Sequence, residues 1–190
     1  MKILTLFLST LLSILHVSAQ TKDSTFLYKI MPHNVKIQHA GNIGMFSVGF
    51  GYQSPNKKWK GDFMYGIVPP KYADKAIHSI TLKGKFAPIN KTYTPDVSVN
   101  WLNTGLWVSR ALGSKYFRGL PDYYDDGYYY FSTAMHIGVF VGSEVKYKKI
   151  GFYYEVGTTE KHIINYVKNT GSIQLNAIFN IGMGLVYHLK

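Results

Sequence analysis

The chain of 190 residues is long enough for one domain, and it contains no cysteine, which excludes disulfide frameworks, thiol nucleophiles and cysteine metal sites. Lysine and arginine exceed aspartate and glutamate by 21 to 10, a balance that suits either nucleic acid or an anionic membrane surface. Beyond the first 20 residues, no segment approaches the ~20 apolar residues that a membrane-spanning helix requires.

The first residues have the order of a secretory signal peptide. Lys2 supplies a positive charge, residues 3–17 are mostly apolar, and Val17-Ser18-Ala19 is a small-residue cleavage pattern. We therefore expect residues 1–19 to be removed and Gln20 to become the mature N-terminus. An uncleaved anchor helix is the alternative. Export argues against nucleic acid as a partner and leaves the phosphates of membrane lipid as counter-ions for the positive charge.

Residues 20–43 are polar and mixed, and we interpret them as a lead-in or a first edge strand. From Gly44 onward, apolar residues alternate with polar or small ones with a period of two, which predicts strands with two different faces. A chain that crosses a bilayer without helices must close its strands into a barrel, because lipid satisfies no open sheet edge. We therefore expect residues 44–190 to form a barrel of about eight strands.

The alternating segments follow one another along the chain. They cover residues 46–53, 59–67, 79–86, 102–109, 131–147, 151–157 and 175–190. The segment 131–147 is long enough to contain a hairpin near Gly142-Ser143. Every second residue from Leu175 to Leu189 is apolar, a stripe of roughly 45 Å that would cross a bilayer when tilted. An eighth strand is expected in residues 34–41, 143–149 or 161–168.

Alternation alone does not say which face points inward. A soluble lipocalin-like barrel is apolar inside, whereas an outer-membrane barrel is apolar outside. Here the polar face is rich in glycine and carries isolated charges of both signs. Many of the 30 aromatic residues, 16 of them tyrosine, fall near strand ends, as in an interfacial belt. The predicted fold class is therefore all-β: a closed, antiparallel, up-and-down transmembrane barrel of about eight strands.

Several stretches of the sequence are similar to a known group of proteins. They are residues 32–52, which begin Pro32-His33-Asn34-Val35-Lys36 and end Phe50-Gly51-Tyr52, then Asp62-Phe63-Met64-Tyr65-Gly66-Ile67-Val68-Pro69, Ile77-His78-Ser79-Ile80-Thr81-Leu82-Lys83 and Tyr154-Glu155-Val156-Gly157-Thr158. They resemble the small outer-membrane β-barrel proteins common in Bacteroidota. The resemblance covers most of the mature chain, and it implies a barrel in the outer membrane but no particular activity. Many outer-membrane barrels end on an aromatic residue that the assembly machinery reads, whereas this chain ends Tyr187-His188-Leu189-Lys190.

Charged residues on the polar face of the strands are the first candidate site. They are Lys60, Asp62, Lys83, Lys85, Glu144, Lys146 and Glu155. A barrel of eight strands is filled by side chains, and ions buried there must pair or lose several kcal/mol each on desolvation. We therefore expect an ion network that fills the lumen; a gated ion path or a polar catalytic cluster is the alternative.

The second candidate is a tyrosine-rich segment within residues 113–130. Its members are Arg118, Tyr123, Tyr124, Asp125, Asp126 and Tyr128. Such loops form adaptable recognition surfaces, but the same residues also suit an interfacial girdle that continues into the next strand. Both interpretations stay open on the sequence.

Catalytic chemistry is not indicated by any local motif. Ser132, His136 and Glu144 share a predicted face, but side chains four residues apart on a strand are separated by about 13 Å. The histidines lack metal-ligand spacing, so we assign no catalytic residue, metal or cofactor.

We expect an integral outer-membrane protein of a Gram-negative bacterium with a structural or surface-interaction role. Its expected partners are outer-membrane lipid and the outer-membrane assembly machinery. One alternative is an enzyme that modifies lipid A or phospholipid. The other is a soluble periplasmic carrier of a small apolar ligand.

Overall fold

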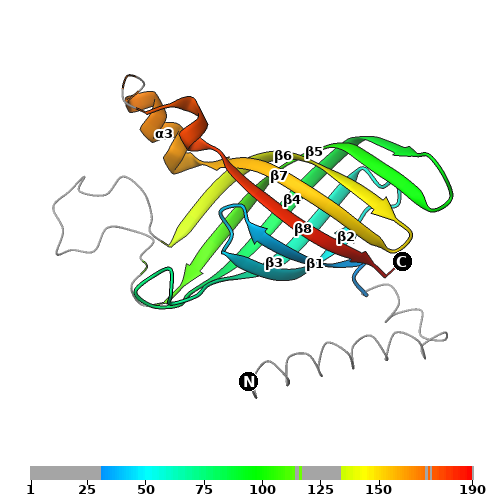
Figure 1. Cartoon of the computed structure of the whole chain (residues 1–190), viewed down its shortest axis with the longest axis horizontal. Helices are drawn as coiled ribbons and strands as arrows, with labels where there is room; N and C mark the ends of the chain where they lie inside the picture. The colour runs from blue at the N-terminus through cyan, green and yellow to red at the C-terminus, as the bar shows by residue number, and fades with distance from the viewer. Residues whose placement is uncertain (1–30, 114–115, 117–133, 170, 172, 190) are drawn as a thin grey trace, which may run out of the picture. The chain divides into compact units, whose positions relative to one another are not determined.

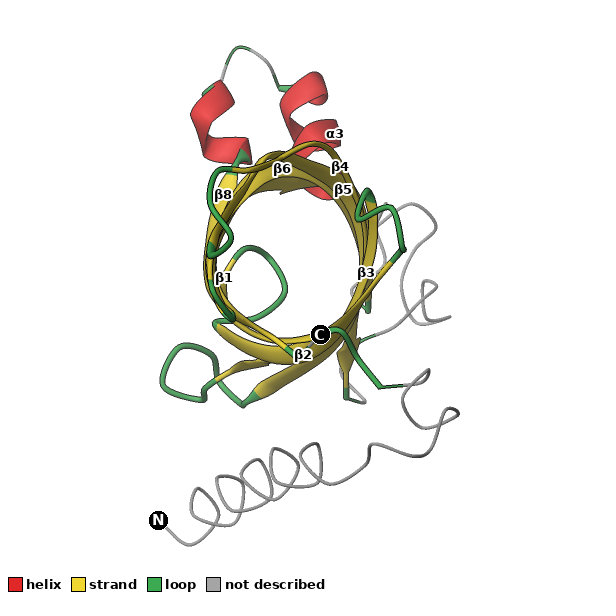
Figure 2. Cartoon of the chain, turned by 90° about the vertical axis from the view of Figure 1, so that its right-hand side faces the viewer, coloured by secondary structure: helices red, strands yellow, loops and turns green. Residues whose placement is uncertain are grey.

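The computed structural model describes residues 31–113, 116, 134–169, 171 and 173–189. Residues from Pro32 onward form one compact unit. Within the described residues, eight antiparallel strands follow chain order, and pairing of the first with the last closes the barrel (Figures 1 and 2). The elements are β1 (Asn34–Ala40), β2 (Phe46–Gln53), β3 (Trp59–Val68), β4 (Ile77–Thr92), β5 (Val97–Leu112), β6 (Met135–Tyr147), β7 (Ile150–Thr159), α3 (Glu160–Lys168), η1 (Leu175–Ile178) and β8 (Asn180–His188).

The predicted all-β, closed, antiparallel barrel is confirmed. Its first strand lies before Gly44, where the barrel was predicted to begin. This strand, β1, occupies one of the three places considered for the eighth strand. Residues 161–168 belong instead to α3, a helix that begins at the N-cap Thr159 and lies outside the ring of strands (Figure 2). The strand alternation ends at Thr159 because the Thr159 side chain accepts a hydrogen bond from the His162 backbone N–H and starts the helix.

The hairpin considered near Gly142-Ser143 is not formed. Strand β6 continues to Tyr147, and the chain turns at Lys148, whose φ is +54°. Gly142 has a packing role instead, because a Cβ atom there would collide with the backbone carbonyl oxygen of Tyr154 on β7. The glycine therefore permits close strand approach.

The last strand begins later than the predicted apolar stripe, which started at Leu175. Residues Leu175–Ile178 form the 3₁₀ turn η1, and β8 begins at Asn180. The extent of strand pairing explains this start. Pairing of β8 with β7 begins at Asn180, opposite Gly157, and its pairing with β1 begins at Gly182, opposite Ala40. Residues before Asn180 have no strand partner to extend the ladder.

Most large apolar side chains of the strands point away from the barrel, and the charged ones of the central strands point into it. Along β8, Gly182, Gly184, Val186 and His188 are buried, whereas Ile181, Met183, Leu185 and Tyr187 are exposed. Along β3, Lys60, Asp62 and Met64 are buried, whereas Trp59, Phe63 and Tyr65 are exposed. The barrel is therefore apolar on its outer face, as the alternation and the glycines predict.

The two ends of the barrel have different connections. Short turns at residues 54–58, 93–96 and 148–149 lie at the end that holds the C-terminus (Figure 1). The connections at residues 41–45 and 69–76, together with α3 and η1, lie at the opposite end. We call these the turn end and the helix end.

A buried apolar cluster fills the lumen toward the helix end. It consists of Ile43, Met64, Trp107 and Phe140. Ile43 comes from the loop between β1 and β2, and its backbone carbonyl oxygen accepts hydrogen bonds from the hydroxyls of Ser79 and Ser47, at 2.7 and 3.4 Å. These bonds hold the loop against the inner wall of the barrel, where the Ile43 side chain is buried.

Candidate functional site

Buried ion pairs occupy the middle of the lumen. The Lys36 ammonium lies 2.8 Å from the Asp62 carboxylate, and the Lys85 ammonium lies 2.9 Å from the same group. Lys85 also pairs with Glu155 at 2.6 Å, and Lys83 pairs with Glu155. All five side chains are buried. Each carboxylate therefore bridges two ammonium groups, which is the pairing that buried ions require. We call these five residues the central network.

The central network connects opposite walls of the barrel. Lys36 is on β1, Asp62 on β3, Lys83 and Lys85 on β4, and Glu155 on β7. Since β4 and β7 are not neighbours in the barrel, the pairs with Glu155 cross the lumen. Next to Asp62, a Cβ atom on Gly51 of β2 would collide with an oxygen of the Asp62 carboxylate. Glycine at this position therefore leaves room for the carboxylate.

Polar and aromatic side chains complete the surroundings of the lysines. The Gln38 side-chain oxygen accepts hydrogen bonds from Lys83 at 2.8 Å and from the Tyr153 hydroxyl at 3.2 Å. The Lys85 ammonium lies 5.2 Å from the centre of the Tyr153 ring and 5.5 Å from that of Phe140. Ring faces attract cations, so both rings offset part of the desolvation cost of Lys85.

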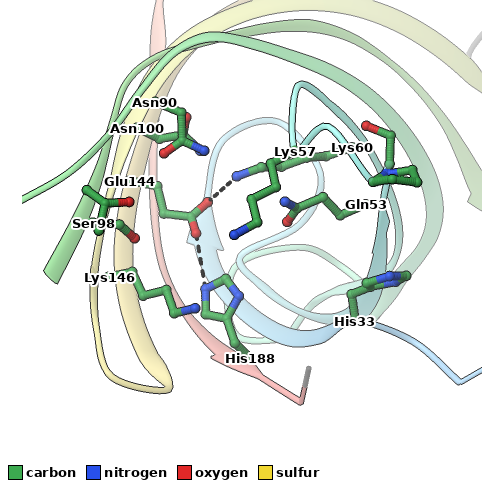
Figure 3. A pocket seen from close by; sticks show the side chains of 13 residues that line it. His33, Gln53, Lys57, Lys60, Asn90, Ser98, Asn100, Glu144, Lys146 and His188 are labelled. Carbon is green, nitrogen blue, oxygen red and sulfur yellow. Dashed lines mark hydrogen bonds and ion pairs between the residues drawn. The ribbon is translucent and has the colours of Figure 1, made fainter. Parts of the chain in front are cut away.

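A second group of charges lies nearer the turn end. Glu144 pairs with Lys60 at 3.1 Å and with His188 at 3.2 Å. These three residues line a cavity of about 440 Å³ together with other polar side chains (Figure 3). Lys60, Asp62 and Met64 face the lumen in turn along β3. The order from the turn end is therefore the cavity, the central network and then the apolar cluster.

Six of the seven charged residues predicted for the lumen form buried ion pairs. The seventh, Lys146, lines the cavity without an ion pair among the described residues. Sequence reasoning missed Lys36 and His188. Lys36 alternates with Val35 and Ile37, so the period of two places it on the polar face once residues 34–41 are chosen among the three candidates for the eighth strand.

Other sequence candidates have different outcomes. Arg118, Tyr123, Tyr124, Asp125, Asp126, Tyr128 and Ser132 lie outside the described residues. His136 and Glu144 do not meet: the His136 ring nitrogen Nδ1 lies 3.0 Å from Glu160 at the start of α3. Among the described residues, no group of three or more histidine and acidic side chains could hold a metal ion. In the same part of the chain, no helix is both long and apolar enough to cross a bilayer.

No family model and no curated protein matches the sequence. Among solved structures, the chain is similar to the crystal structure of the outer membrane enzyme PagL, with 12% sequence identity and a TM-score of 0.38. That match covers 81% of this chain and 95% of the other. Likeness at this level does not assign an activity.

Proposed function

We propose that the protein is an integral outer-membrane β-barrel with a side-chain-filled lumen and a structural or surface-interaction role. The observation that supports this most is the apolar outer face around a charged interior. Large apolar side chains are exposed on every strand, for example Ile37, Phe50, Phe63, Leu82, Leu106, Val139, Phe152 and Leu185. Such a continuous apolar surface would associate in water, whereas acyl chains solvate it.

Aromatic residues near the turn end support the same placement. Tyr52, Trp59, Tyr147 and Tyr187 are exposed at the ends of their strands. Tyrosine and tryptophan favour the boundary between acyl chains and headgroups, because one part of the ring system is apolar and the other forms hydrogen bonds. Outer-membrane barrels have short periplasmic turns, so we orient the turn end toward the periplasm and the helix end toward the cell exterior.

The interior argues against both a pore and an apolar carrier. The central network and the cluster around Trp107 occupy the lumen with buried side chains, which argues against a wide aqueous pore and against an apolar chamber. A lipocalin-like carrier needs the reverse arrangement, with apolar residues lining the inside. The remaining surfaces for interaction are the loops of the helix end and the polar cavity of the turn end.

Membrane extraction with heat-modifiable gel migration tests this proposal. We expect the protein to fractionate with the outer membrane and to migrate differently before and after boiling, because a closed barrel resists unfolding by detergent. A soluble periplasmic protein with the same mobility in both samples would contradict it.

A lipid-modifying enzyme is the second candidate, and the pair of His136 with Glu160 is the observation that favours it. A carboxylate on one ring nitrogen orients a catalytic histidine, and Ser109 lies directly opposite His136 on β5. However, Ser109 is buried and its hydroxyl accepts a hydrogen bond from Thr81 at 2.8 Å. That arrangement fits a structural role better.

We therefore expect His136→Ala to leave the lipid profile of the outer membrane unchanged by mass spectrometry. The matched control is His78→Ala, which removes a histidine bonded to Tyr65 on another strand. Both variants are first checked for heat-modifiable migration. If an unmodified lipid accumulated in the His136 variant and not in the His78 variant, the result would contradict the structural role and support an enzymatic one.

A further inference from the structure

We propose that the cavity at the turn end binds a small, soluble, phosphate-bearing anion. Its volume of about 440 Å³ exceeds by roughly an order of magnitude the ~30 Å³ that one water molecule occupies in the liquid. The volume also falls within the common range for small-molecule sites, about 300–1,000 Å³. The cavity therefore has room for a solute with several non-hydrogen atoms.

The charges that line the cavity are unbalanced. Figure 3 shows the ammonium groups of Lys57, Lys60 and Lys146 directed into the same space, where Glu144 is the lining carboxylate. Glu144 is already paired with Lys60 and His188. In the described part of the chain, no carboxylate pairs with Lys57 or Lys146. A recess lined by one sign of charge focuses the field and attracts an anion.

The neutral residues of the cavity supply donors for the same ligand. Gln53, Asn90 and Asn100 carry side-chain amides and Ser98 carries a hydroxyl. Phosphate oxygens accept hydrogen bonds from amides, hydroxyls and ammonium groups alike. Asn100 adds an independent indication: it is 6% exposed, and its Oδ1 atom has no hydrogen-bond partner among the described residues. A hydroxyl of an organic phosphate would satisfy that oxygen.

The position of the cavity favours a soluble ligand over a lipid headgroup. The ring of strands separates the cavity from the lipid-facing side chains, and the buried central network lies deeper in the lumen. We therefore expect a ligand to enter from the turn end. That the ligand comes from the periplasm rests on the proposed function; binding itself requires only the folded barrel.

Calorimetric titration of the full chain with inorganic pyrophosphate tests the site. The protein is reconstituted in nanodiscs of zwitterionic lipid, where no headgroup carries a net charge. The test variant is the double substitution Lys57→Gln and Lys146→Gln. The control is Lys58→Gln with Lys149→Gln, which removes two exposed lysines beside the same turns but outside the cavity.

We expect saturable binding at one site in wild type and control, and a loss of affinity of at least ~10-fold in the test variant. The single variant Lys146→Gln provides the same comparison if the double variant fails to fold. Absence of saturable binding by wild type, or an equal loss in both double variants, would overturn the proposal. So would competition by phosphatidylglycerol added to the nanodiscs, since it would identify a headgroup as the ligand. A soluble protein that still bound pyrophosphate would refute the membrane placement and leave this site intact.

Discussion

Asp62→Asn is expected to lower the free energy of unfolding by roughly 3–5 kcal/mol, the range for removing one partner of a buried ion pair. Asp62 is 3% exposed and bridges Lys36 and Lys85. Without its negative charge, Lys85 keeps Glu155, but Lys36 keeps no paired carboxylate among the residues that the structure describes. The substitution therefore leaves a buried ammonium group without a counter-charge, and desolvation of that group is the main cost.

Urea-induced unfolding in lipid vesicles, followed by tryptophan fluorescence, measures this effect. Asp74→Asn is the control, because it makes the same charge change at an exposed carboxylate in the loop between β3 and β4. The double variant Lys36→Met with Asp62→Leu should recover part of the loss, since it removes the orphaned charge as well. Equal midpoints for Asp62→Asn and Asp74→Asn would refute a stabilising role for the central network.

Leu185→Arg is expected to destabilise the barrel in lipid vesicles by roughly 2–4 kcal/mol, as arginine does near the bilayer midplane on the lipid face of a barrel. Leu185 is 47% exposed in the middle of β8, where Ile37 and Phe152 flank it on the neighbouring strands. At this depth the guanidinium group would be transferred from water to acyl chains, which accounts for the loss of stability.

The control for this substitution is Tyr72→Arg. Tyr72 is 61% exposed, but it lies in the loop of residues 69–76, beyond the ends of the strands. Unfolding in vesicles of the same lipid compares the two variants. If Leu185 faced water instead, both substitutions would change the free energy of unfolding by no more than about 0.5 kcal/mol. That result would contradict the assignment of the outer face of the barrel to lipid.

The period of two predicts faces but not partners. It places Asp62, Lys83, Lys85 and Glu155 on one face of their strands, because each alternates with apolar neighbours. Their pairing depends on closure of the barrel, which brings Lys85 to a carboxylate 70 positions further along the chain. A local sequence pattern carries no information about partners so far apart along the chain. The members of the network were therefore predictable, but their contacts were not.

Two local features were harder to predict. Strand β1 has only seven residues, and its apolar side is limited to a few positions around Val35 and Ile37. Its strand character is fixed by pairing with both β2 and β8. Helix α3 has only nine residues, and it is held at the barrel rim by the Glu160 carboxylate, which accepts a hydrogen bond from the Ile137 backbone N–H of β6. Both depend on contacts between segments distant in sequence.

The ion pairs that cross the lumen also constrain the order of assembly. Glu155 lies on β7 and its partners Lys83 and Lys85 lie on β4, so these pairs form only when the sheet curls far enough to bring the two strands together. A half-curled ribbon inserted in a bilayer would expose these charges to hydrocarbon, at a cost of several kcal/mol for each ion. For the proposed outer-membrane barrel, insertion and closure are therefore expected to occur together, because strand-by-strand entry would leave these charges unpaired in lipid.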